Sequence, residues 1–451
     1  MKFWAFTGTV FLLALASATG LGQVSRNEDA FGPIAALLSD VQTSQSGSVP
    51  LTLDEAELIA LETNPEIELA ARRLAMARAH VPTAGALDDP MAMYRGWGVP
   101  LKRPWDYNAA QNMFSVSQTF QSGGKRDLRT NIAEADVNRA QADLAQVQLE
   151  LKVRVRKAFF DLLLTQDEIR IHEQHVGIAQ QAIGAARIKY TAGTVPQQDM
   201  LKAQVALTAL AEHMIRFDRD AEVARARLNT LLGRSPDSPI EVRGEHAVLA
   251  PLPPLTSLMA TAMNTRPDLA AAEANAERSH KEQLLAKKIY APDFTIAAGY
   301  MLMPSGQDFR NSYMVEGSMN LPWLNRKKHD AEIAEATVKA TEQDAELAAM
   351  RNSARGQIAE ALAEAQSMQK LALFYQKQLK PQAEANLQSS VIAYENNKTA
   401  FLDLLDSQMR VIDIDLAWAQ AVGDFDTRLA DLELAIGGSV DKVLTGNTEV
   451  K

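Results

Sequence analysis

The sequence predicts a mainly helical protein with a β-barrel part, in which one repeat is present twice. Three observations lead to this fold class. The same motifs recur in the same order in both halves of the chain, and the stretch from Lys125 to Tyr190 contains no proline and is rich in helix-forming residues. In addition, four short blocks alternate apolar with polar residues, which is the period of a β-strand.

The N-terminus has the pattern of an export signal. Lys2 precedes an apolar run that extends to Ala16, and small residues follow through Ala18, so residues 1–18 are predicted to be a signal peptide. Residues 19–50 lack periodicity and are predicted to be an extended segment. The apolar run is too short to span a bilayer as a helix, and no later stretch is long enough, so any entry into a membrane must use β-strands.

The composition excludes several classes of protein. The chain has no cysteine, which rules out disulfides, thiolate metal sites and a cysteine-linked lipid. The net charge of −10 and the pI near 5.4 argue against nucleic acid as a partner. Because 47% of the residues are hydrophobic, the chain can form a core.

The duplication is clearest in two matching segments. Residues 189–204 read KYTAGTVPQQDMLKAQ, and residues 393–408 read AYENNKTAFLDLLDSQ. Tyr190, Asp199 and Gln204 of the first segment correspond to Tyr394, Asp403 and Gln408 of the second. The predicted organisation is a first repeat at 51–234, a proline-rich linker at 235–254, a second repeat at 255–438 and a flexible tail at 439–451.

Each repeat is predicted to contain an alanine-rich helix, two strands, a very long helix, a tight turn and a last helix. In the first repeat these elements are the helix 52–80, the strands at about 90–98 and 112–120, and the long helix 125–190. In the second they are the helix 255–289, the strands at about 293–302 and 312–322, and the long stretch 325–395. Pro381 is expected to break or kink that last stretch. The long helices are too polar for lipid, so they must pack on other helices.

The extended blocks fit strands that cross a membrane. In one of them Phe294, Ile296 and Tyr300 alternate with smaller or more polar residues, and aromatic residues lie near the ends of several blocks. The alternative is a small soluble sheet with one solvent-exposed face. In lipid, four strands cannot close a barrel and open sheet edges do not persist, so the membrane interpretation requires several chains. Two chains would give eight strands, and three would give twelve.

Taken together, these features resemble the TolC-like outer-membrane efflux factors. The resemblance covers about residues 50–438 and is carried by AGALDDPM (84–91), SQTFQSGGKRDLR (117–129), the Tyr-x-x-Gly of Tyr190–Gly193 and the segment 393–408. These phrases are most similar to the heavy-metal branch of the family, the CusC and CzcC type.

The resemblance implies a passive channel and no enzyme. It implies a homotrimer with a twelve-stranded barrel in the outer membrane of a Gram-negative cell, in contact with its lipid, and a helical tunnel across the periplasm. A periplasmic adaptor (membrane fusion protein) and an inner-membrane efflux pump, of the RND type, would be its partners, and no cofactor is expected. The substrates would be heavy-metal cations or small toxic compounds. The alternatives are a soluble periplasmic adaptor or scaffold, and the duct of a drug-efflux or type I secretion system.

The resemblance also implies roles for individual residues. An acidic pore constriction is expected at Asp403, Asp406 and Asp413. A periplasmic gate is expected at Asp199 and Tyr394, but the family's basic partner is replaced by Thr399, with Lys398 one residue earlier. The tips that dock the adaptor would be formed by Tyr190, Gly193, Thr194, Asn396 and Asn397.

Other motifs carry no function in this interpretation. His172 and His175 are three residues apart on a helix and could share a metal ion, but without a third ligand they are predicted to be a surface pair. Asp88 and Asp89 precede a strand and fit a turn. Gly-Gly-Lys at 123–125 lacks the glycine spacing of a phosphate loop and fits the end of a strand and the start of a helix.

Overall fold

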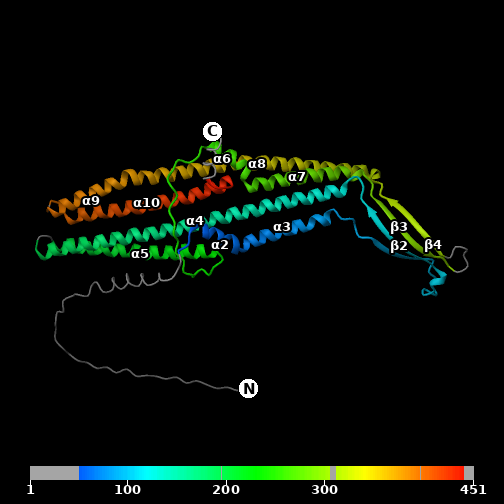
Figure 1. Cartoon of the computed structure of the whole chain (residues 1–451), viewed down its shortest axis with the longest axis horizontal. Helices are drawn as coiled ribbons and strands as arrows, with labels where there is room; N and C mark the ends of the chain where they lie inside the picture. The colour runs from blue at the N-terminus through cyan, green and yellow to red at the C-terminus, as the bar shows by residue number, and fades with distance from the viewer. Residues whose placement is uncertain (1–49, 194–195, 305–310, 397, 441–451) are drawn as a thin grey trace, which may run out of the picture. The chain divides into compact units, whose positions relative to one another are not determined.

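The computed structural model describes residues 50–440 apart from 194–195, 305–310 and 397. The predicted signal peptide at 1–18, the segment at 19–49 and the tail beyond residue 440 lie outside the described residues. The predicted fold class is confirmed, because the described part of the chain is mainly helical and contains one small antiparallel sheet (Figure 1).

The two repeats contain the same elements in the same order. The first consists of α2 (Leu53–Thr63), α3 (Pro65–Ala84), β1 (Met91–Trp97), η1 (Tyr107–Ala109), β2 (Gln111–Phe120), α4 (Lys125–Thr191) and α5 (Gln197–Leu231). The second consists of α6 (Leu255–Thr265), α7 (Pro267–Lys287), η2 (Lys288–Tyr290), β3 (Phe294–Leu302), β4 (Asn311–Met319), η3 (Pro322–Asn325), α8 (Arg326–Phe374), η4 (Tyr375–Leu379), α9 (Lys380–Glu395) and α10 (Phe401–Ile436).

The alanine-rich stretch that opens each repeat is two helices, and the prediction of one continuous helix is wrong. Asn64 has extended backbone angles (φ −74°, ψ 126°), and its side chain accepts a hydrogen bond from the Glu66 amide. Pro65 then occupies the first turn of α3. A proline lacks the amide proton that a helix interior needs and drives the preceding residue into the extended region. Arg266 and Pro267 make the same break in the second repeat.

The long helices are as predicted. α4 runs for 67 residues without interruption. The corresponding stretch of the second repeat contains one turn of π-helix, η4, which ends two residues before Pro381. Proline cannot donate the next intrahelical hydrogen bond, and a π-turn is one way to accommodate that loss. The break expected at Pro381 is therefore present.

The four strands form one antiparallel sheet in the order β1-β2-β3-β4. The register places Tyr94 opposite Phe114, Phe114 opposite Tyr300, and Tyr300 opposite Tyr313, so these aromatic residues share one face. Val315 lies on the same face and is 81% exposed in the single chain. β4 ends at Met319, earlier than the predicted residue 322, because Pro322 begins η3.

Two hydrophobic clusters hold the short helices of the repeats in equivalent places. In the first repeat, Ala56 and Ala60 of α2 pack with Leu162 of α4 and Leu228 of α5. In the second repeat, Leu258 and Ala262 of α6 pack with residues of α8 and α10, among them Leu432. Within the described part of the chain, no helix is long and apolar enough to cross a membrane.

Candidate functional site

Most of the predicted gate and docking residues lie at the ends of two helical hairpins. We call α4 with α5 the first hairpin and α9 with α10 the second hairpin. Gly193 ends α4 with a positive φ of 72°, a conformation that glycine adopts without strain. Tyr190 and Asn396 are exposed at the tips. Thr194 and Asn397 lie outside the described residues.

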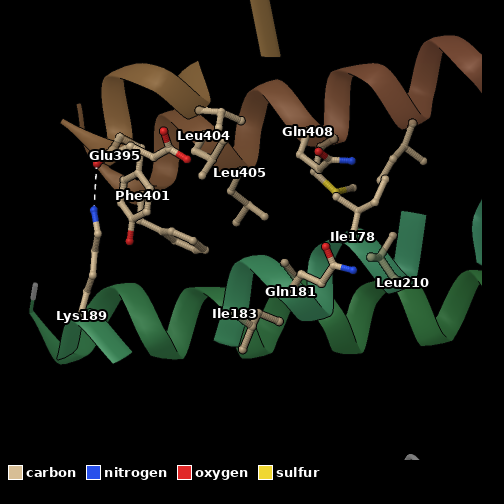
Figure 2. Close-up of a pocket in the computed structure, with 15 residues that line it drawn as sticks. Ile178, Gln181, Ile183, Lys189, Leu210, Glu395, Phe401, Leu404, Leu405 and Gln408 are labelled. Carbon is tan, nitrogen blue, oxygen red and sulfur yellow. Dashed lines mark hydrogen bonds between the residues drawn. The ribbon is translucent and has the colours of Figure 1, made fainter. Parts of the chain in front are cut away.

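Tyr394 is the centre of the contact between the hairpins. Only 6% of it is exposed, and its ring lies 5.6 Å from the ring of Phe401 in a T-shaped arrangement. Lys189, in the last turn of α4, approaches it from the first hairpin. The Lys189 Nζ atom lies 3.9 Å from the centroid of the Tyr394 ring and donates a 2.9 Å hydrogen bond to the Tyr394 carbonyl oxygen. Figure 2 shows Lys189 reaching across from α4 to the second hairpin.

Asp199 acts on Tyr394 through its charge. Burial first, and then the negative charge of Asp199, raise the pKa of the Tyr394 hydroxyl above its ordinary value of 10. The hydroxyl therefore stays protonated. Its oxygen is buried and makes no hydrogen bond to any described residue. The charge of Asp199 thus acts on Tyr394, and no hydrogen bond joins these two predicted gate residues.

The two other predicted gate residues do not reach Tyr394. The Thr399 hydroxyl donates to a carboxylate oxygen of Asp403, and that oxygen also accepts a 3.3 Å hydrogen bond from the Ala400 amide. Thr399 and Asp403 thereby cap the N-terminus of α10. Lys398 is exposed. The positive charge beside Tyr394 comes instead from Lys189, which the sequence did not indicate because Lys189 lies 205 positions from Tyr394.

The three predicted constriction residues lie on the exposed side of α10. Asp403, Asp406 and Asp413 are all exposed in the single chain, whereas Ser407 and Gln408 are buried. The Ser407 hydroxyl contacts Ser390 of α9, and the Gln408 amide lies 3.2 Å from His175 of α4. The packed face of α10 therefore contacts its own chain, and the acidic face points away from it.

The prediction that His172 and His175 form a surface pair is wrong. They are 0% and 6% exposed, because α5 and α10 cover the face of α4 on which they lie. The Nε2 atom of His172 lies 2.7 Å from the Leu210 carbonyl oxygen, and that of His175 lies 3.1 Å from a carboxylate oxygen of Asp415. Among the residues that the structure describes, no group of three or more histidine, aspartate or glutamate side chains could hold a metal ion.

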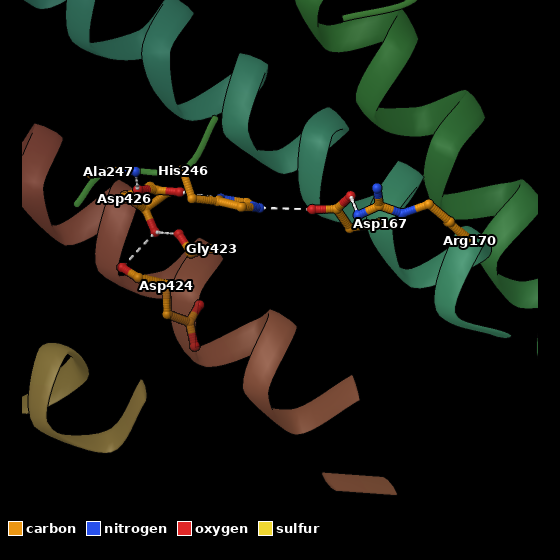
Figure 3. A network of polar contacts seen from close by, with 8 residues as sticks. Asp167, Arg170, His246, Ala247, Gly423, Asp424 and Asp426 are labelled. Carbon is orange, nitrogen blue, oxygen red and sulfur yellow. Dashed lines mark hydrogen bonds and ion pairs between the residues drawn. The ribbon is translucent and has the colours of Figure 1, made fainter. Parts of the chain in front are cut away.

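A histidine of the linker joins the two repeats. The ring of His246 lies between Asp426 of α10, 2.5 Å from Nδ1, and Asp167 of α4, 2.8 Å from Nε2 (Figure 3). Burial alone would lower the pKa of His246. The hydrogen bonds to the two carboxylates and their charges outweigh burial and raise the pKa from 6.5 to about 9. His246 is therefore a cation at neutral pH, held by one carboxylate from each repeat.

A cavity of about 370 Å³ separates the hairpins behind the Lys189–Tyr394 contact, and we call it the gate cavity. Its walls are mainly apolar and come from α4 and α5 on one side and from α9 and α10 on the other (Figure 2). Tyr394 and Lys189 both line it. The candidate gate and the gate cavity therefore share two residues.

Comparison with known proteins shows similarity along both repeats. The family described as outer membrane efflux protein matches residues 59–234 and 258–438. The cobalt-zinc-cadmium resistance protein CzcC of Cupriavidus metallidurans is 24% identical over 384 residues, which cover 83% of this chain and 87% of the relative. Nodulation protein T of Rhizobium leguminosarum bv. trifolii is 22% identical over 401 residues and covers 85% of each chain.

Solved structures also match this chain over most of its length. CusC, solved in a study of the conformational changes that accompany folding and transmembrane channel formation, superimposes with a TM-score of 0.73 at 16% identity. The match covers 88% of this chain and 96% of that one. At 16% sequence identity, the structural similarity to CusC establishes the fold alone.

Proposed function

Because the chain belongs to the outer membrane efflux protein family, we propose that it is the outer-membrane exit duct of a tripartite efflux system in a Gram-negative cell. Three copies form the duct. A periplasmic adaptor docks on the hairpin tips and recruits an inner-membrane pump of the RND type, which supplies the energy. The chain itself is a gated passage and carries out no chemical step.

The sheet is the observation that carries this proposal. One face presents Tyr94, Phe114, Tyr300, Tyr313 and Val315, while β1 and β4 are edge strands in the described part of the chain. An apolar face of this kind fits lipid better than water, which disfavours a soluble adaptor. In lipid every backbone polar group needs a partner, so β4 of one copy must pair with β1 of the next until the sheet closes.

The proposed cargo is heavy-metal cations. The name of the relative from Cupriavidus metallidurans, a cobalt-zinc-cadmium resistance protein, supports this class of substrate. The acidic face of α10 supports it independently, because Asp406 and Asp413 are exposed and point away from their own chain. In a trimer, each position would form a ring of three carboxylates, and rings of carboxylates attract cations into a narrow water path.

The proposed gate is the contact between the hairpins. Lys189 holds the Tyr394 ring and carbonyl oxygen, and the charge of Asp199 acts on the Tyr394 hydroxyl. Opening requires the two hairpins to separate, and this breaks the contacts of Lys189 with Tyr394. Docking of the adaptor on the tips would provide the free energy for that separation.

The test combines fractionation with metal accumulation. The full chain should appear in the outer-membrane fraction as a trimer that dissociates on heating and conducts in planar bilayers. Cells that lack it should accumulate more cobalt, zinc or cadmium, measured by elemental mass spectrometry, and the plasmid-borne gene should reverse this. Recovery of a monomer from the soluble periplasm would contradict the duct, and unchanged accumulation beside a conducting trimer would contradict the metal cargo.

A further inference from the structure

Methionines gather on one face of the sheet. Strand side chains alternate between the two faces, and the register places the aromatic residues Tyr94, Phe114 and Tyr300 together on one of them. The other side chains of the opposite face are mainly polar, among them Ser117 and Thr295. In the proposed duct this opposite face lines water, so contact with lipid does not account for methionines there. It nevertheless carries all but one of the methionines of the four strands, and we call it the methionine face: Met91, Met93, Met113, Met301 and Met314.

Three of these methionines surround a glycine. Met113 of β2 lies directly opposite Met301 of β3, and Met314 of β4 lies directly opposite Gly299, two residues before Met301. Directly opposed side chains have Cβ atoms about 4.5–5.5 Å apart, and diagonal neighbours are roughly 7–8 Å apart. Gly299 places no side chain on this face, and a methionine has three rotatable bonds beyond its Cα atom. The three sulfur atoms can therefore meet above the glycine.

A buried hydroxyl lies beside the same glycine. Ser115 of β2 is directly opposite Gly299 and is 5% exposed. A Cβ atom added to Gly299 would lie 2.9 Å from the Ser115 Cβ atom, so the serine side chain adjoins the space that the glycine leaves. The Ser115 Oγ atom makes no hydrogen bond to any described residue. Most buried polar atoms in proteins are paired, and this oxygen keeps its lone pairs available to a cation.

Two sulfur atoms of the methionine face already accept contacts from polar groups. The side-chain amide of Gln111 donates to the sulfur of Met301, and the guanidinium of Arg95 lies 3.6 Å from the sulfur of Met93. Thioethers are weak acceptors, so a cation that binds Met301 can displace the Gln111 amide. Met93 is held by a positive group of the protein itself, and we leave it out of the site.

Two charged residues flank the three methionines, and their charges have opposite signs. Arg95 lies opposite Met113, and Glu316 follows Met314 by two residues on the same face. Both are exposed in the single chain, where solvent and salt screen them. The carboxylate offsets the repulsion that the guanidinium exerts on a cation.

The thioethers determine the class of cation. They are soft, uncharged ligands that select Cu(I), whereas zinc sites in proteins use imidazole, thiolate or carboxylate ligands. The chain has no cysteine. We propose that Met113, Met301 and Met314 bind a monovalent cation of the Cu(I) class, with the Ser115 hydroxyl oxygen as a further donor. This site goes beyond the proposed export function and does not require it, because its four residues belong to the sheet of one chain.

Silver(I) is a suitable probe, because it shares the charge and the ligand preference of Cu(I) and is stable in air. The purified full-length protein, in detergent and chloride-free buffer, is titrated with silver nitrate in a calorimeter, and X-ray absorption at the silver edge identifies the neighbouring atoms. We expect one saturable silver ion per chain with sulfur neighbours, which can only be methionine because the chain lacks cysteine. Binding that does not saturate, or nitrogen and oxygen neighbours alone, would overturn the proposal.

Zinc and cobalt test the selectivity of the site. Either divalent ion, in about tenfold excess, should leave the bound silver in place, because a set of uncharged thioethers favours the softer cation. Displacement of silver by zinc or cobalt would contradict a thioether site.

A matched pair of variants tests the sulfur ligands. Met301→Leu keeps the side-chain volume and removes one ligand, so it should weaken silver binding at least about tenfold, which corresponds to about 1.4 kcal/mol. Met319→Leu on β4 is the control, since Met319 shares the face of Tyr313 and should not contribute. If Met301→Leu binds silver as tightly as the wild type while its circular dichroism spectrum is unchanged, the site is refuted.

Ser115→Ala tests the oxygen donor. Because its hydroxyl has no partner in the described part of the chain, the change should not lower the melting temperature of the silver-free protein. It should weaken silver binding about fivefold, the factor that corresponds to about 1 kcal/mol, a value comparable to a neutral hydrogen bond. Ser117→Ala, on the same strand and the same face, is the control. Equal silver affinities of the two serine variants would exclude Ser115 as a ligand.

Discussion

The ammonium group of Lys189 lies over the ring of Tyr394, 3.9 Å from its centroid, and also donates to the carbonyl oxygen of the same residue. One side chain of the first hairpin thus makes two contacts with one residue of the second. A cation over an aromatic ring is worth about 0.5–2 kcal/mol, and a hydrogen bond from a charged donor about 1.5–3 kcal/mol. A few kcal/mol at this point is enough to set the population of an open state.

We expect Lys189→Met to open the resting channel. The change keeps an apolar chain of similar length but removes both contacts, and a loss of 1–2 kcal/mol raises the open fraction roughly 5- to 30-fold. Planar-bilayer recordings and entry of a large antibiotic into cells measure this. Lys189→Arg should keep the closed state, and Lys202→Met on α5 provides a lysine control. If Lys189→Met does not raise the resting conductance, Lys189 does not hold the proposed gate closed.

Substitutions of the acidic residues of α10 should distinguish an effect on ion permeability from an effect on the stability of the helix. Asp406→Asn and Asp413→Asn remove exposed charges, and each should lower the ratio of cation to anion permeability by at least about twofold. Asp403→Asn should act on permeability alone, since an amide oxygen can still accept from Thr399 and Ala400. Asp403→Ala should also cost α10 about 1 kcal/mol of stability. Reversal potentials in salt gradients measure the permeability ratio, and thermal unfolding measures the stability. Unchanged permeability ratios would contradict the proposal that these aspartates form a cation-selective constriction.

The sheet allows a matched test of membrane insertion. Val315, at the middle of β4, shares the face of the aromatic residues, whereas Ser318 on the same strand lies on the other face. An arginine on a lipid-facing position near the bilayer midplane costs about 2–4 kcal/mol. Val315→Arg should therefore reduce the heat-modifiable trimer in the outer-membrane fraction, and Ser318→Arg should leave it. Equal yields of both variants would contradict a lipid-facing sheet.

Local patterns in the sequence predicted the fold well. The length of α4, the four strands and the break near Pro381 follow from residue composition and from periods of 2 and 3.6, which are properties of neighbouring residues. The break at Asn64 was also visible locally, because a proline in the next position ends a helix. The residues on both sides are good helix formers, and their composition predicts one continuous helix across this boundary.

The site was less accessible to sequence reasoning, because its contacts join distant segments. The spacing of His172 and His175 places them on one face of α4 but gives no sign that α5 and α10 cover that face. Likewise, Tyr394 is identified through the family resemblance, but its partner Lys189 belongs to the other hairpin. The repeat offers no guide to Lys189, since the equivalent residue in the second half is Ala393.

His246 makes another distant contact, and its geometry depends on its charge. Its two ring nitrogens face the carboxylates of Asp426 and Asp167, and a histidine can donate from both nitrogens only when it is protonated. The surrounding charges include Arg170, which is paired with Asp167. The second oxygen of Asp426 accepts a 2.8 Å hydrogen bond from the Ala247 amide. The linker is thus fixed to both repeats through the imidazolium.

We expect the stability that His246 contributes to disappear in alkaline solution. Its pKa in the folded protein is about 9, above the ordinary 6.5, so the contribution is complete below pH 6.5 and is lost as the pH rises through 9. His246→Gln should therefore lower the melting temperature at pH 6, on the order of 5 °C, and have little effect at pH 10. His280→Gln, which removes the exposed pair with Asp344, is the control and should change little at either pH. If His246→Gln lowers the melting temperature equally at pH 6 and pH 10, the ring stabilises the protein through its shape and not through its charge. Loss of a neutral contact does not depend on the protonation of the imidazole.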